Sequence, residues 1–124
     1  MSECERLLAE YEALRAEITL RSLDRDVVVR QALVAQQAAH LDETRAQQRL
    51  SELREAYRAD PTALCLVAAA DQAEGAYEDA RMAALTVSQE ASATAKKALA
   101  RAEADSDQLH ELGLRLREAR RARL

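Results

Sequence analysis

Large aromatic side chains are almost absent from this sequence of 124 residues. It has no Phe and no Trp, and tyrosines account for its aromatic content of 2%. Hydrophobic residues make up 48% of the chain, with alanine the commonest and leucine at intervals. Few side chains are therefore large enough to fill a wide globular interior, and a narrow line of packing between helices suits the composition better.

Residues that interrupt helices are equally scarce, since the chain holds two Gly and one Pro. Charged residues reach 32%, and Ala, Glu, Arg, Leu and Gln are in excess. This composition is typical of long helices and coiled coils. The sequence predicts an all-α fold in one domain, residues 1–124.

Cysteines and long apolar runs are also few. Cys4 and Cys65 give no disulfide framework, and Cys65 is interpreted as a small buried packing residue. The longest apolar run, residues 63–70, is far shorter than the roughly 20 residues that span a bilayer. The opening residues are charged from the third position and do not resemble a secretory signal. We expect a cytoplasmic protein without membrane insertion.

The single proline predicts the architecture. Asp60 followed by Pro61 is a pattern for starting a helix, because aspartate caps free amides and proline at the first helical position loses no hydrogen bond. We expect a first helix over about residues 3–59, a turn near 60–61 and a second helix over about residues 61–121. Segments 86–94 and 104–108 could interrupt the second helix, but neither contains Gly or Pro, and we expect continuity.

Each predicted helix has one line of small or apolar residues at heptad spacing, here called the seam. If the chain folds back at Asp60, paired residue numbers sum to about 123 in an antiparallel hairpin. Large residues then oppose large ones near the termini, and small residues oppose small ones in the middle, which favours a two-helix coiled-coil hairpin over a kinked rod. Asp105 falls about one turn from Arg21, so the two can neutralise each other. We expect the seam to include Val28, Ala32, Ala35, Ala39, Asp42, Ala46, Leu50, Leu53 and Tyr57 on the first helix, and Ala91, Ala95, Ala98 and Ala102 on the second.

No residue set indicates catalysis. The chain has no phosphate-binding glycine loop and no Ser/His/Asp set, and its two histidines are far apart in the hairpin. Asp107 and His110 have the spacing of half a metal site in a helix bundle, but the other half is missing, and an ordinary surface pair is the preferred interpretation. We expect no enzyme, no cofactor, no metal and no small-molecule substrate.

Charge distribution gives a first candidate surface. A net charge of −4 gives no general attraction for nucleic acid. The last ten residues are nonetheless rich in arginine, including Arg117, Arg120 and Arg121, while the start of the chain is rich in glutamate. The arginines either bind a protein partner or neutralise those glutamates, and the second alternative is favoured.

A second apolar line gives another candidate surface. Its members fall at heptad spacing on the first helix, on the side opposite the seam, where a hairpin alone leaves them in water. We interpret the line as an interface with a second copy or with a helix of another protein. Met82 and Leu85 could widen it into a four-helix core. The apolar line consists of Leu20, Leu23, Val27, Val34 and Leu41.

The architecture resembles a known family. A chain that starts its first helix almost at residue 1, folds back at its midpoint through "RADPT" and ends in the basic "RLREARRARL" is similar to the central-stalk family of bacterial type III secretion and flagellar export. The resemblance covers the whole chain, contains no diagnostic motif and transfers no functional residue. It implies a coiled-coil hairpin that connects a hexameric export ATPase to the export gate. The alternatives are a homo-oligomeric helical scaffold or adaptor, and a helical secretion substrate or its chaperone.

Overall fold

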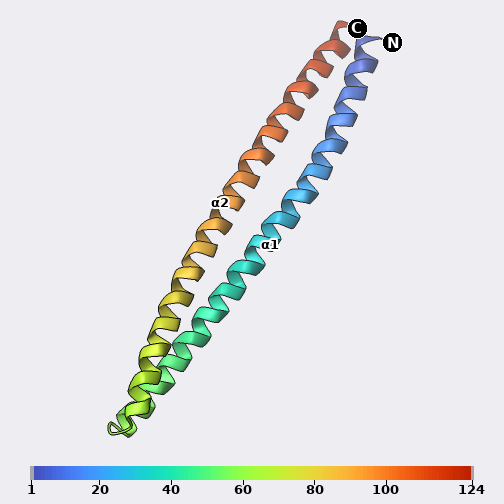
Figure 1. The fold of residues 1–124 in the computed structure, drawn as a ribbon. Helices are drawn as coiled ribbons and strands as arrows, with labels where there is room; N and C mark the ends of the chain where they lie inside the picture. The colour runs from blue at the N-terminus through green and yellow to red at the C-terminus, as the bar shows by residue number, and fades with distance from the viewer. Residues whose placement is uncertain (1, 124) are drawn as a thin grey trace. The chain divides into compact units, whose positions relative to one another are not determined.

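The protein is an all-α helical hairpin, as the sequence predicts. The computed structural model describes residues 2–123, and within them it contains α1 (Glu3–Ala59), a short turn and α2 (Leu64–Ala122), with no strand (Figure 1). Among these residues, neither helix has a segment long and apolar enough to cross a membrane.

The first helix is long because nothing in it breaks the hydrogen-bonding pattern. It contains neither Gly nor Pro over its 57 residues. Ser2 caps its start, since the Ser2 hydroxyl accepts a hydrogen bond from the Glu5 amide at 3.2 Å. Glu3 and Glu5 lie in the first turn and Arg58 in the last, where each charge interacts favourably with the helix dipole.

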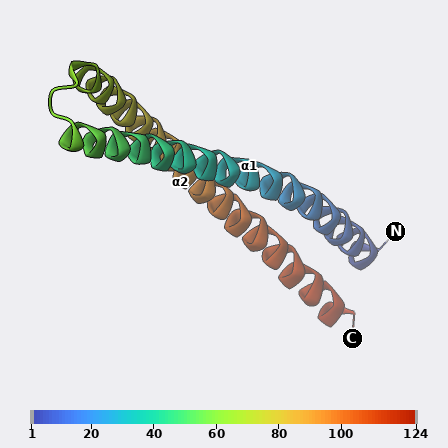
Figure 2. The same ribbon diagram turned by 90° about the horizontal axis from the view of Figure 1, so that it is seen from below.

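The turn differs from the prediction at its C-terminal side. The Ala63 amide donates to the Asp60 carbonyl at 3.2 Å, so residues 60–63 form a turn with Pro61 in its second position, which its fixed φ suits. The Asp60 carboxylate accepts the Thr62 hydroxyl at 2.7 Å. The predicted start of the second helix at Pro61 is therefore wrong by three residues, and α2 begins at Leu64. Figure 2 shows the short connection between the two helices.

The second helix is continuous through both segments that could have interrupted it. At Thr86, the side-chain hydroxyl donates to the Met82 carbonyl at 3.1 Å, so this polar residue is satisfied within the helix. The prediction of continuity is confirmed. Cys65 lies in the first turn of α2 and is exposed, so its interpretation as a buried residue is wrong.

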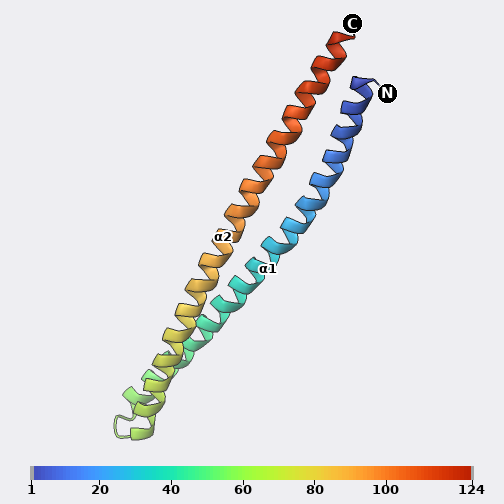
Figure 3. The same ribbon diagram turned by 45° about the horizontal axis from the view of Figure 1, so that its top comes forward.

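Contacts within the hairpin gather into two compact units. Unit 1 comprises Met1–Val29 and Thr94–Leu124, and unit 2 comprises Arg30–Ala93. Each unit therefore contains one segment of α1 and one antiparallel segment of α2, and the two ends of the chain belong to unit 1 (Figure 3).

Unit 1 is packed around leucines near the termini. Leu7 is 1% exposed, and Leu116 is also buried. A Cβ added to Gly113 would lie 3.6 Å from Cε2 of Tyr11, so the tyrosine ring lies beside this glycine of the opposite helix. These residues agree with the predicted pairing of the helix ends.

Unit 2 has a thinner core, as its alanine content predicts. Leu50, Ala73 and Ala91 are its buried apolar residues. The Gln36 side-chain amide donates to the Ser88 hydroxyl at 3.0 Å across the two helices. This polar pair lies between the helices at a position where the sequence predicts small apolar residues.

Several predicted seam residues are wrong. Val28 is 51% exposed, and the less exposed residue is its neighbour Val29. Arg21 and Arg25, four residues apart, both point toward α2. The next residue of α1 that faces α2 is again four positions further on, at Val29. The same shift of one position recurs at two later sites on α1, and α2 shows one shift of its own. Gln36 and Glu43 are less exposed than Ala35 and Asp42, Thr94 is less exposed than Ala95, and Tyr57 and Ala102 are exposed. The other predicted seam residues of α1 after Arg25 are at least partly buried, as expected: Ala32, Ala39, Ala46, Leu50 and Leu53.

Replacing Gly75 with alanine is expected to stabilise the protein. Gly75 lies inside α2, and a Cβ added to it would meet nothing within 4 Å. Alanine in a helix interior is more favourable than glycine by about 1 kcal/mol, so the urea midpoint followed by circular dichroism should rise. A lower midpoint would mean that the glycine serves a packing role that the structure does not contain.

Candidate interaction surfaces

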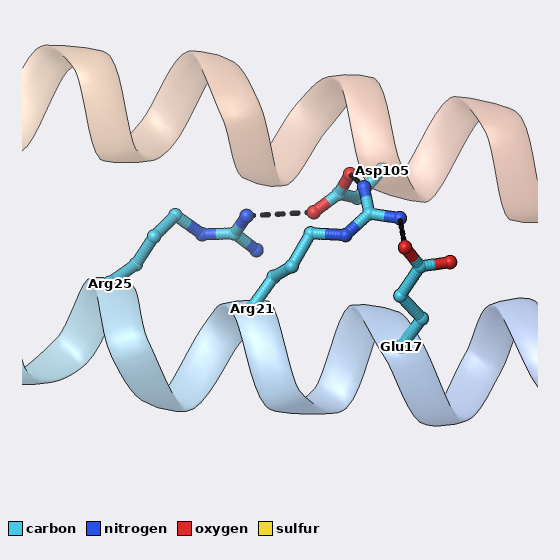
Figure 4. A network of polar contacts seen from close by, with 4 residues as sticks. All are labelled: Glu17, Arg21, Arg25 and Asp105. Carbon is cyan, nitrogen blue, oxygen red and sulfur yellow. Dashed lines mark hydrogen bonds and ion pairs between the residues drawn. The ribbon is translucent and has the colours of Figure 1, made fainter.

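The most buried charged residue is Asp105, on the α2 segment of unit 1. Arg21 Nη1 donates to Asp105 Oδ1 at 2.9 Å, and Arg25 Nη1 donates to Asp105 Oδ2 at 2.7 Å (Figure 4). Both oxygens of the carboxylate are thus bound to arginines one helical turn apart. The predicted pairing of Asp105 with Arg21 is confirmed, and Arg25 is an additional partner.

Glu17 extends this network toward solvent. Its carboxylate lies 3.0 Å from Arg21 Nη2, so Arg21 bridges two acids (Figure 4). The Asp105 side chain is 9% exposed and that of Arg25 is 14% exposed, whereas Glu17 and Arg21 reach water. Each of these groups has at least one partner in the network, which links the two helix segments of unit 1.

The apolar line is exposed in both units. In unit 1 its members are Leu20, Leu23 and Val27, and in unit 2 they are Val34 and Leu41. Their exposed fractions lie between 47% and 65%. These residues therefore point away from the partner helix of their unit, as the spacing predicts, while their role in binding stays a prediction.

Unit 2 carries further exposed apolar side chains. Met82 and Leu85 on α2 and Leu33 on α1 are all about half exposed. Leu85 also lines a groove between the helices, together with His40 and Glu43. His40 Nδ1 lies 3.8 Å from Glu43 Oε2, which is too long for a hydrogen bond.

The arginines near the end of α2 are exposed and lack carboxylate partners. Among residues 2–123, no ion pair involves Arg117, Arg120 or Arg121. The glutamates that pair in this unit do so within their own helix, as Glu3 does with Arg6 at 3.9 Å. The predicted neutralisation between the two ends is therefore not formed in the part of the chain that the structure describes.

Metal-binding residues do not gather in the described chain. No group of three His, Cys, Asp or Glu side chains between residues 2 and 123 is placed to hold an ion. Asp107 and His110 are both exposed on α2.

Comparison with protein-family models, curated proteins and solved structures finds no match for this chain.

Proposed function

We propose that this protein is a non-enzymatic structural and interaction protein that binds another protein through its apolar line. The proposal rests on the exposure of the apolar line, which comprises Leu20, Leu23 and Val27 in unit 1, and Val34 and Leu41 in unit 2. Single exposed leucines are common on protein surfaces, but exposed apolar residues that recur at helical spacing are typical of helix-binding surfaces.

The energetics support this interpretation. Burying a large aliphatic side chain contributes about 1.5 to 3 kcal/mol when it is fully removed from water. Each residue of the apolar line has at least 47% of its surface exposed. A partner that covers these side chains would therefore gain a large part of this burial free energy at every position. The two helices of each unit are already in contact through their seams, so the partner must come from outside the unit.

For the partner, we propose a hexameric ATPase of type III or flagellar export, with this chain as the stalk that links it to the export gate. The proposal rests on the resemblance described above and on the antiparallel hairpin, which is the architecture that the family implies. In this role the protein would act in protein transport in the cytoplasm of a bacterium.

A pull-down tests both the proposed partner and the proposed binding surface. We expect the wild-type chain to retain a hexameric export ATPase at low salt, and Val27→Glu to retain much less, because the charge would be buried at the interface. Leu99→Glu is the matched control, since Leu99 is exposed on α2 and lies outside the apolar line. Absence of the ATPase from the wild-type pull-down contradicts the stalk assignment. Equal retention by both variants contradicts binding through the apolar line.

The second candidate is a homo-oligomeric scaffold, favoured by the exposed Met82 and Leu85 on α2 of unit 2. These side chains add apolar area on the second helix, which a four-helix bundle of two copies would bury. Light scattering separates the candidates. If the protein is a stable dimer and Val27→Glu weakens that dimer, the scaffold is supported. If the protein is a monomer, binding to a different protein is supported.

A further inference from the structure

A groove of about 450 Å³ lies between the two helix segments of unit 1, near the ends of the chain. Its lining includes the apolar side chains of Leu109 and Leu116 and the ring of Tyr11. Tyr11 lies opposite Gly113, and because glycine has no side chain, space remains open beside the tyrosine ring. The groove could therefore receive apolar side chains from another molecule.

The rim of this groove carries positive charge alone. Its lining includes Arg117 and Arg120, with His110 beside them, and it includes no carboxylate. No ion pair between residues 2 and 123 involves either arginine. In a chain with a net charge of −4, a groove lined both by apolar side chains and by arginines that form no ion pair within residues 2–123 is a local exception.

We propose that this groove binds an acidic amphipathic helix of a partner protein. Leucine-sized side chains of that helix would pack on Tyr11 and Leu114, and its carboxylates would pair with Arg117 and Arg120. Carboxylates suit arginine because the planar guanidinium can donate two parallel hydrogen bonds to them. No residue of the apolar line borders the groove, so this inference goes beyond the proposed function and does not depend on it.

The dimensions of the groove fit a short helix. Its α2 residues run from Ser106 to Arg120, which corresponds to about 20 Å at 1.5 Å per residue. A helical peptide of about 14 residues has the same length. The apolar side chains in the lining favour a peptide over nucleic acid, because nucleic acid binding relies mainly on phosphate contacts along a basic surface.

The experiment measures binding of a defined probe to the full chain. The probe is a fluorescent amphipathic peptide of about 14 residues, with leucines at positions i, i+3 and i+7 and glutamates beside them. We expect fluorescence anisotropy to give a dissociation constant in the micromolar range. A peptide with lysine in place of each glutamate is expected not to bind.

Two pairs of variants localise the binding. Arg117→Glu is expected to weaken it about tenfold, since the substitution removes an attraction and adds a repulsion, while Arg115→Glu outside the groove has little effect. Leu114→Glu is expected to weaken it similarly, because Leu114 lines the groove and is 44% exposed, whereas Leu99→Glu has little effect. All four positions are exposed, so each variant should keep the helical circular dichroism of the wild type.

Three results would overturn the proposal. One is that the acidic peptide does not bind, and another is that Arg115→Glu weakens binding as much as Arg117→Glu. The third is that a single-stranded oligonucleotide of equal charge binds more tightly than the peptide and is displaced by it. In that case the arginines form a general anion-binding surface, without a groove that recognises a helix.

Discussion

Asp105→Ala is expected to lower the free energy of unfolding by about 3 kcal/mol, because it removes one member of a buried ionic network and leaves Arg25 without a partner. Arg25 loses its 2.7 Å hydrogen bond and remains largely buried. Arg21 loses one partner but keeps Glu17 and can turn toward water, which limits the loss. Urea unfolding followed by circular dichroism measures the change.

Two further variants test the origin of this loss. Asp107→Ala removes an exposed carboxylate from the same helix and should change stability by less than about 0.5 kcal/mol. Replacing Arg21, Arg25 and Asp105 together with leucine should recover most of the stability, because a buried ionic network contributes less than apolar packing of similar volume. If Asp105→Ala is no more destabilising than Asp107→Ala, the network does not hold unit 1 in register.

Leu7→Ala is expected to destabilise the protein by about 2 to 3 kcal/mol. Leu7 is the most deeply buried large side chain described, and its truncation removes apolar contacts and leaves a cavity between the helices of unit 1. The loss should fall toward the lower end of the range for leucine, because a seam between two helices can relax and admit water more easily than a globular core. Thermal and urea unfolding both report it.

Leu20→Ala is the matched control for Leu7→Ala. Leu20 lies on the same helix and belongs to the same unit, but it is exposed, so the isolated chain should be almost unaffected by its truncation. A large destabilisation by Leu20→Ala would mean that its side chain is already buried in solution, as in a dimer formed through the apolar line. If the midpoint of unfolding then also rose with protein concentration, self-association would be identified as the cause.

The sequence was sufficient to predict the two helices, their direction and the pairing of Asp105 with Arg21. These features depend on strong local signals. One proline within a chain almost without glycine defines the turn, and a lone acid on one seam opposite arginines on the other is costly unless they meet.

The seam positions that were predicted wrongly depend on contacts between the two helices. Val28 and Val29 are equally apolar neighbours, so hydrophobicity alone could not decide which of them turns inward. Gln36 is less exposed than Ala35 because its side-chain amide donates to Ser88 on the opposite helix, an interaction that a pattern of small apolar residues does not indicate.

The candidate surfaces were predictable to different degrees. Spacing alone identified the exposed residues of the apolar line, because heptad positions opposite a seam must face away from it. The groove beside Tyr11 was not predicted, since it requires the space at Gly113 and the absence of carboxylates around Arg117. Both depend on which residues of the two helices come together.

The four-residue connection at residues 60–63 has a practical consequence for working with this protein. Asp60, Pro61 and Thr62 are exposed, and their hydrogen bonds are formed among themselves and with the adjacent end of α1. Lengthening a flexible loop costs only about 0.6 kcal/mol for each doubling of its length. An epitope tag or a glycine-serine insert should therefore be accepted there with both helices intact.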